Sequence, residues 1–163
     1  MKTLSDRAAY SVSYAPHAAR VSDLVRLAPA YAGAGRGSGA ERKLYEVRAC
    51  LSAYKREADR DYHLVIADPA THETMIAEIP SAQECSGACA YPWNARKYVA
   101  ARQFVETRFG QAGRRFRNLY PRPLVDVSGV GFFDTLHGQW GVARNGIELH
   151  PVLRLRRLGW CAP

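Results

Sequence analysis

The chain lacks the sequence features of membrane proteins and of several large enzyme classes. No apolar run among its 163 residues approaches the roughly 20 residues of a membrane-spanning helix. It contains no phosphate-binding GxxxxGKS/T loop, no GxSxG or HExxH motif, and no dinucleotide-binding GxGxxG motif. We therefore expect one globular domain, large enough to bury a core, whose chemistry depends on residues that the fold brings together.

A signal peptide is also absent from the start of the chain. Residues 1–27 contain neither the basic segment nor the apolar segment that secretion signals carry. Two expectations follow from the residues alone. The protein is either cytoplasmic, or it is the mature form of an exported protein with an added Met.

Acidic residues are scarce in the second half of the chain. Residues 1–90 hold 11 basic and 11 acidic side chains, whereas residues 91–163 hold 12 basic and 4 acidic ones, so the net charge of +8 lies in the second half. Arginine makes planar, bidentate contacts with phosphate, so this half predicts an anionic partner, namely nucleic acid, another polyanion or an anionic membrane surface. A solubilising face explains the same charge. The candidate nucleic-acid contacts are Arg114, Arg115, Arg117, Arg122 and Arg144.

Four cysteines leave several pairings open. Cys85 and Cys89 lie close together in a loop, while Cys50 lies in a predicted strand and Cys161 lies near the C-terminus. A local Cys85–Cys89 bridge with a Cys50–Cys161 bridge would suit an oxidising compartment, but four cysteines allow three complete pairings. A zinc site is the rival interpretation, although the C-x3-C spacing has no second pair beside it. Four free thiols are the third.

The hydrophobic pattern predicts a mainly β (α+β) fold preceded by an N-terminal extension. Residues 1–42 form the extension, with a helical turn at Ser22–Leu27 capped by Ser22 and a flexible Gly-rich loop at residues 28–43. Residues 43–163 form the domain. Its predicted elements are strands at Lys43–Lys55, Tyr62–Ala67 and Thr74–Ile79, a helix capped by Asn94 and ended by Gly110, and strands at Leu124–Phe133 and Ile147–Leu155. The order β-β-β-α-β-β is typical of a five-stranded OB-like barrel.

Acids and imidazoles recur at alternate strand positions. Residues i and i+2 of a strand project to the same face, so Asp61 projects with His63, and Glu148 projects with His150. Such pairs suit a divalent metal ion or general acid–base chemistry, although outward pairs of this kind are often merely solvated. Further candidates are Glu78 at the end of the third strand, and Asp134 and His137 in the long connection between the last two strands.

Three motifs, in order, resemble a family of small bacterial proteins that often carry secretion signals. They are Lys55-x-Glu57-x-Asp59-x-Asp61-x-His63-Leu64-Val65-Ile66, then Thr74-Met75-Ile76-Ala77-Glu78-Ile79-Pro80, then the segment from Gly129 to Val152. The opening Lys2–Asp6 resembles the start of the mature region in that family. The resemblance covers roughly residues 43–153, implies a secreted or periplasmic protein, favours disulfides and implies no activity.

The arrangement is also similar to staphylococcal-nuclease-like OB folds. In those proteins, acids that enter the first hairpin and an acid before a proline at the end of the third strand bind calcium. The matching positions are Asp61, with Asp59 beside it, and Glu78. The chain departs from that family because no arginine precedes Glu78 closely and because Arg60 separates the two acids of the turn. A histidine, whether His63, His137 or His150, would then replace the arginine functions.

Three hypotheses follow from these residues. The first is a secreted, metal-dependent phosphodiesterase, in which Asp61 and Glu78 hold a Ca²⁺, Mg²⁺ or Zn²⁺ ion. Its candidate catalytic residues are His63, His137, His150 and Glu148. The second is a non-catalytic module that binds nucleic acid or another polyanion. The third is a structural or interaction domain, in which the same acids and histidines form a hydrogen-bond network around the Asn145-Gly146 turn.

Overall fold

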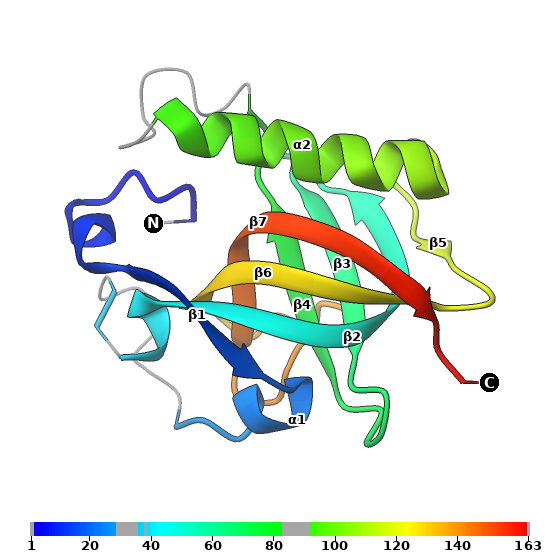
Figure 1. Ribbon diagram of the computed structural model, residues 1–163, viewed down its shortest axis with the longest axis horizontal. Helices are drawn as coiled ribbons and strands as arrows, with labels where there is room; N and C mark the ends of the chain where they lie inside the picture. Colours follow the sequence, from blue (N-terminus) through cyan, green and yellow to red (C-terminus); the bar gives the residue numbers. More distant parts are fainter. Residues whose placement is uncertain (1, 29–35, 38, 83–91, 163) are drawn as a thin grey trace.

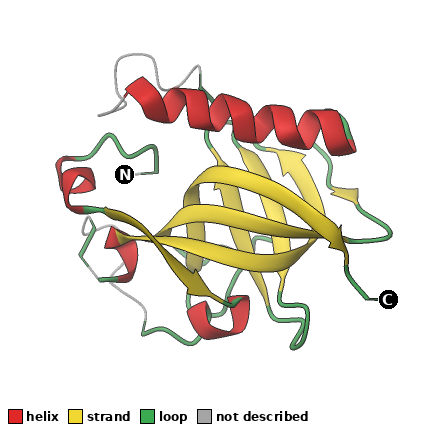
Figure 2. Cartoon of the chain, in the orientation of Figure 1, coloured by secondary structure: helices red, strands yellow, loops and turns green. Residues whose placement is uncertain are grey.

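The structure is a computed structural model that describes residues 2–28, 36–37, 39–82 and 92–162. Figures 1 and 2 show a strand-rich molecule in which one long helix lies across an end of a curved sheet. The long elements are β2 (Lys43–Arg56), β3 (Tyr62–Ala67), β4 (Thr74–Ile79), α2 (Pro92–Phe109), β6 (Pro123–Phe133) and β7 (Ile147–Trp160). The short ones are η1 (Arg7–Ser11), β1 (Ser13–Ala19), α1 (Val21–Leu24), η2 (Ala40–Arg42) and β5 (Arg117–Asn118).

Five strands close into an OB-like barrel. β2 pairs antiparallel with β3 and β6, β3 pairs with β4, and β6 pairs with β7. A parallel pairing between β4 and β7 completes the ring (Figure 1). The predicted order of elements and the predicted barrel are therefore confirmed.

The side chains of β2 follow the predicted alternation between the core and the other face only in part. Val47, Ala49 and Leu51 are fully buried, as strict alternation predicts. The register with β3 shifts between Leu51 and Ala53, and beyond this irregularity the side chain of Tyr54 joins the core. Ala53 is fully buried, as strict alternation predicts, but the predicted exposure of Tyr54 is wrong, because Tyr54 is fully buried as well.

α2 covers one end of the barrel with the predicted apolar face. Tyr98, Ala101 and Val105 are buried in the core. The hydroxyl of Tyr54 donates to the carbonyl oxygen of Phe109 at 2.6 Å, which satisfies a backbone acceptor at the end of the helix. Among the described residues, no helix is long and apolar enough to cross a membrane.

The N-terminal segment packs against the barrel more closely than the sequence predicts. β1 pairs in parallel with β2, and Leu4 and Val12 belong to the core. The backbone N–H of Ser22 donates to a carboxylate oxygen of Asp68 at 3.1 Å, which ties α1 to the turn between β3 and β4. Residues 29–35 and 38 of the predicted Gly-rich loop at residues 28–43 lie outside the described residues.

Both predicted N-caps are wrong, whereas the predicted end of the long helix at Gly110 is confirmed, because α2 ends at Phe109 and Gly110 has a positive φ. α1 begins at Val21, so Ser22 lies within it, and the side chain of Asp23 accepts the N–H of Arg20 instead. α2 is helical from Pro92, so Asn94 is its third residue and is completely buried. Proline is favoured at the first position of a helix because its fixed φ suits the helix and its missing N–H is not needed there.

One disulfide links the first barrel strand to the end of the last. Cys50 in β2 bonds Cys161, which follows β7, with their Cα atoms 6.0 Å apart. This is one of the pairings left open by the sequence. Cys85 and Cys89 lie outside the described residues. Because the Cys50–Cys161 bridge spans 111 residues, it restricts the unfolded chain over most of the barrel.

The double variant Cys50→Ala/Cys161→Ser is expected to have a free energy of unfolding about 2–5 kcal/mol lower than that of the wild type. The reason is that the unfolded chain regains the freedom that the bridge removes. Urea unfolding of both proteins without reductant measures the difference. Replacement of the neighbouring Ser52 by Ala is the control. Equal midpoints for the double variant and the wild type would contradict a stabilising role for this bridge.

Candidate metal centre

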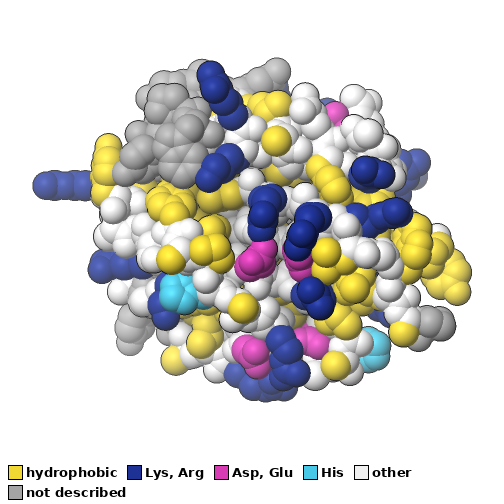
Figure 3. Space-filling view, viewed as in Figure 1, with side chains coloured by type: hydrophobic (Ala, Val, Ile, Leu, Met, Phe, Trp, Pro, Cys, Tyr) yellow, Lys and Arg dark blue, Asp and Glu magenta, His cyan; other side chains and the backbone are white. Residues whose placement is uncertain are grey.

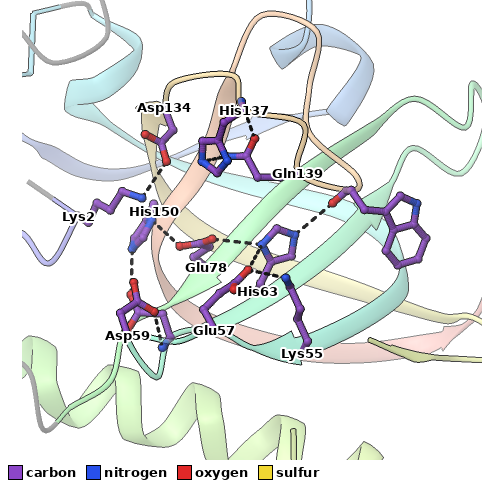
Figure 4. Close-up of polar contacts among 12 residues, drawn as sticks. Lys2, Lys55, Glu57, Asp59, His63, Glu78, Asp134, His137, Gln139 and His150 are labelled. Atoms are coloured by element: carbon purple, nitrogen blue, oxygen red, sulfur yellow. Dashed lines mark hydrogen bonds and ion pairs between the residues drawn. The ribbon is translucent and has the colours of Figure 1, made fainter. Parts of the chain in front are cut away.

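An acidic hollow of about 310 Å³ lies between the β2–β3 turn and the β6–β7 connection. These two connections flank the ligand-binding face of OB folds. Figure 4 shows carboxylates and imidazoles converging there from several elements of the chain. The lining side chains include Glu57, Asp59, His63, Glu78, Asp134 and His137.

Strand register brings the deepest residues together. His63 in β3 lies opposite Glu78 in the antiparallel β4. β4 runs parallel to β7 with Ala77 beside Leu149, so the next residues, Glu78 and His150, are neighbours as well. Barrel closure therefore joins residues 78 and 150, which lie far apart in the chain, in one cluster.

Asp61, Glu78 and His150 form a triad of potential metal ligands. One ligand atom from each residue lies within 4.8 Å of the other two. His150 Nδ1 is 3.1 Å from Glu78 Oε2, and His150 Nε2 is 3.6 Å from Asp61 Oδ2. All three residues are buried. Two carboxylates and one imidazole form a donor set that suits divalent ions.

Backbone contacts hold Asp61 in place. The N–H of Ser81, just past β4, donates to Asp61 Oδ1 at 2.7 Å. The N–H of Asp61 in turn donates to Asp59 Oδ1 at 3.1 Å. The carboxylate therefore has one oxygen engaged by backbone and the other directed at His150, which is how supported metal ligands are commonly arranged.

The triad perturbs the titration of its members. Burial would raise the pKa of Glu78, but contacts with His150 and His63 outweigh it and hold that pKa far below its usual range. Burial would lower the pKa of His150, but the carboxylates of Asp61 and Glu78 raise it to about 9. The ion-free cluster thus favours a charged imidazolium between carboxylates.

Glu148 adds a buried acid beside this triad. Burial raises the pKa of Glu148 well above its usual range, and the negative charge of Glu78 acts in the same direction. Its Oε1 atom has no hydrogen-bond partner among the described residues, and neither ring nitrogen of His150 has a partner in hydrogen-bond orientation. Buried polar atoms without such partners are costly, and a metal ion would satisfy one ring nitrogen of the imidazole. The residues present therefore fit a divalent ion.

The hollow carries a strong negative charge in a basic protein. Its carboxylates face two lysines: Lys2 Nζ lies 2.8 Å from Asp134 Oδ2, and Lys55 Nζ lies 2.9 Å from Glu57 Oε1. None of the five arginines predicted to contact nucleic acid lines it. Arg117 and Arg144 donate to the carbonyl oxygens of Phe109 and Val25, respectively.

The remaining predicted arginines, Arg114, Arg115 and Arg122, lie in the connection between α2 and β6. On another face, Figure 3 shows basic and acidic side chains intermixed over β2, β6 and β7. Ion pairs there include Arg156 with Asp126 and Arg154 with Glu46. Part of the positive charge of the second half is therefore compensated within the fold.

Sequence reasoning found most of the cluster but missed Glu57, Lys2 and Lys55. Of the candidates, His63, Glu148 and His150 lie with Asp61 and Glu78, whereas His137 is exposed at the rim and contacts the side chain of Gln139. Glu57 belongs to the motif quoted above, so its two-residue spacing from Asp59 and Asp61 was the available signal. The Asn145-Gly146 turn is held by Asn145, whose side-chain amide donates to the carbonyl oxygens of Leu24 and Leu27, and by the backbone N–H of Asp134, which donates to the carbonyl oxygen of Gly146.

No family model and no curated protein matches the chain. Among solved structures, it is similar to a Leishmania major Friedlin protein provisionally described as an aspartyl-tRNA synthetase, with a TM-score of 0.46 and 13% identity. The similarity covers 92% of this chain and 22% of the other, so this chain spans about a fifth of that protein's length.

The ion-free protein is expected to lose stability as pH rises from 6.5 to 9. The pKa of His150 is raised from 6.5 to about 9 by folding, so its stabilising protonation is complete below 6.5 and lost as pH rises through 9. The raised pKa of Glu148 acts in the same direction. Urea unfolding in EDTA across this range measures the slope.

His150→Gln is expected to flatten that slope, whereas Glu73→Gln, in the turn between β3 and β4, is expected to preserve it. An unchanged slope in His150→Gln would show that another group causes the pH dependence.

Proposed function

We propose that the protein is a divalent-metal-dependent hydrolase that cuts phosphodiester bonds of nucleic acid. The observation that carries the proposal is the buried Asp61–Glu78–His150 triad beneath an open hollow. A divalent ion in such a site polarises a phosphoryl oxygen and lowers the pKa of a water molecule. The imidazole ligand favours Zn²⁺ or Mn²⁺ over Ca²⁺, which prefers oxygen ligands throughout.

A basic hollow beside the triad supports an anionic substrate. It has a volume of about 430 Å³ and is lined by three arginines, Arg56, Arg60 and Arg102, and one acid, Glu106. Its lining also includes Ser81, whose N–H donates to Asp61. The guanidinium of Arg102 lies 3.6 Å from the ring centroid of Tyr62 and donates to the carbonyl oxygen of Arg60 at 2.9 Å. A cation held in this way suits a phosphate group, because little side-chain freedom is left to lose on binding.

The residues in and beneath the acidic hollow would have different roles. Asp61, Glu78 and His150 would hold the ion, and the N–H of Ser81 keeps Asp61 oriented. His137 offers an exposed imidazole at the rim, which suits proton transfer. The negative charge of the hollow would repel a polyanion without an ion, so we expect substrate binding to depend on the metal.

Glu78→Gln is expected to lower cleavage of DNA or RNA by roughly a hundredfold, because the amide removes a charged ligand and leaves the side-chain volume almost unchanged. The assay uses plasmid, single-stranded DNA and RNA with Mn²⁺, Zn²⁺, Mg²⁺ or Ca²⁺, and with EDTA. Glu73→Gln, purified in parallel, controls for contaminating nucleases and should cut like the wild type. Cutting that persists in EDTA or in Glu78→Gln would refute the proposed mechanism.

A non-catalytic polyanion-binding module is the second candidate. The exposed Arg114 and Arg115, which lie outside the acidic hollow, favour it because they are open to a phosphate backbone. Such a module needs no metal ion. It also predicts binding to single strands that weakens steeply with salt, because phosphate contacts release counterions.

Arg114→Ala and Arg115→Ala are each expected to reduce the slope of log affinity against log salt by about one, if each arginine contacts one phosphate. Fluorescence anisotropy with a labelled single strand between low and physiological salt measures the slopes. Arg20→Ala, at the opposite end of the sequence, is the control. A flat salt response in the wild type would exclude this module.

A further inference from the structure

Glu78 directs its two oxygens at two different histidines. Its Oε2 atom lies 3.1 Å from Nδ1 of His150, while its Oε1 atom lies 3.3 Å from Nδ1 of His63. Oε1 of Glu57 lies 3.3 Å from the same nitrogen of His63. Figure 4 shows these contacts side by side, with Glu78 between the two imidazoles. A second set of one imidazole and two carboxylates therefore adjoins the first.

The hydrogen bonding of His63 orients Nδ1 as a ligand. Its Nε2 atom lies 3.2 Å from the carbonyl oxygen of Trp140, and because a carbonyl only accepts, Nε2 carries the hydrogen of this contact. In the neutral ring, the lone pair is then on Nδ1, directed at Glu57 and Glu78. Metal-binding histidines commonly donate their other ring N–H to a backbone carbonyl in this manner.

The second set is the more accessible of the two. His63, Glu57 and Glu78 all line the hollow; the side chain of Glu57 is 32% exposed, while that of His63 is 1% exposed. In the first set the side chains of His150 and Asp61 are only 0% and 10% exposed. An ion held by His63 would thus face the space where water and substrate enter.

We infer that the protein has a second divalent-cation position, formed by Glu57, His63 and Glu78, and that Glu78 bridges it to the Asp61–Glu78–His150 position. This inference rests on the proposed function, because it makes the same site a two-metal centre. Pairs of ions about 3.5–4 Å apart are common in enzymes that cut phosphodiester bonds, where they stabilise the attacking and leaving oxygens. Phosphodiesters are accordingly the substrate class that this arrangement favours.

Lys55 competes for the second position. Its Nζ atom lies 2.9 Å from Glu57 Oε1 and 4.7 Å from the ring centroid of Phe116. The ammonium group neutralises Glu57 when no ion is present and repels an ion that enters. Removing this charge while keeping an apolar side chain should therefore strengthen the second position and leave the first nearly unchanged.

Calorimetric titration with Mn²⁺, checked by equilibrium dialysis and metal analysis, is the test. The wild type is expected to bind two ions, Glu57→Gln and His63→Gln one, and the control Glu46→Gln two. Lys55→Met is expected to bind the ion of the second position about tenfold more tightly than the wild type does. Retention of one ion by Glu57→Gln and His63→Gln, with melting curves like that of the wild type, shows that these variants are folded.

The outcomes separate the two proposals. One ion in the wild type, or two ions in both Glu57→Gln and His63→Gln, would overturn the second position and leave the single-metal hydrolase standing. Weaker binding by Lys55→Met would also overturn it, because the lysine would then support the ion. No bound ion in the wild type would remove the second position and the proposed hydrolase together.

Discussion

Parallel pairing of β4 with β7 is the constraint on which the candidate centre depends. Without it, β4 would be the edge of a meander and β7 the second strand of a distant hairpin. Closure brings Glu78 against His150 and places Glu148 beneath the same hollow. The long β6–β7 connection is then held over the end of the β2–β3 turn, so His63 reaches the carbonyl oxygen of Trp140. This pairing thus completes a cluster whose proposed ligands come from three strands and one connection.

Electrostatics make this cluster unlike an ordinary salt bridge. Several carboxylates converge within a hollow of a chain whose net charge is +8. Burial opposes the charge of Glu78 and Glu148, but contacts with His150 and His63 outweigh it at Glu78, so that pKa is lowered, whereas burial prevails at Glu148 and raises its pKa. The lysines Lys2 and Lys55 reach in from two sides to neutralise Asp134 and Glu57. A site that attracts so many cationic groups from its own chain is well suited to bind added cations.

The fold was largely predictable because its strands alternate and its turns are short. The boundaries of β3 and β4 match the predicted ranges, and the buried face of α2 follows from its helical spacing. β1 was missed because its residues are mostly exposed and carry no alternation. The burial of Tyr54 was missed because an irregularity between two paired strands leaves no mark on the spacing of residues within one of them.

The candidate site, like the fold, could be predicted from the sequence only in part. Local spacing alone places Asp61 with His63 and Glu148 with His150, since alternate residues of a strand share a face. Only the tertiary structure decided that Glu78 lies between the two imidazoles and that Glu57 belongs to the cluster. It also decided that none of the five predicted arginines lines the acidic hollow. The meeting of the ligands could not be predicted, because pairing between strands distant in sequence depends on closure of the whole barrel. The sequence by itself determined the ligand chemistry and the order of the elements, whereas the folded barrel decided which ligands meet.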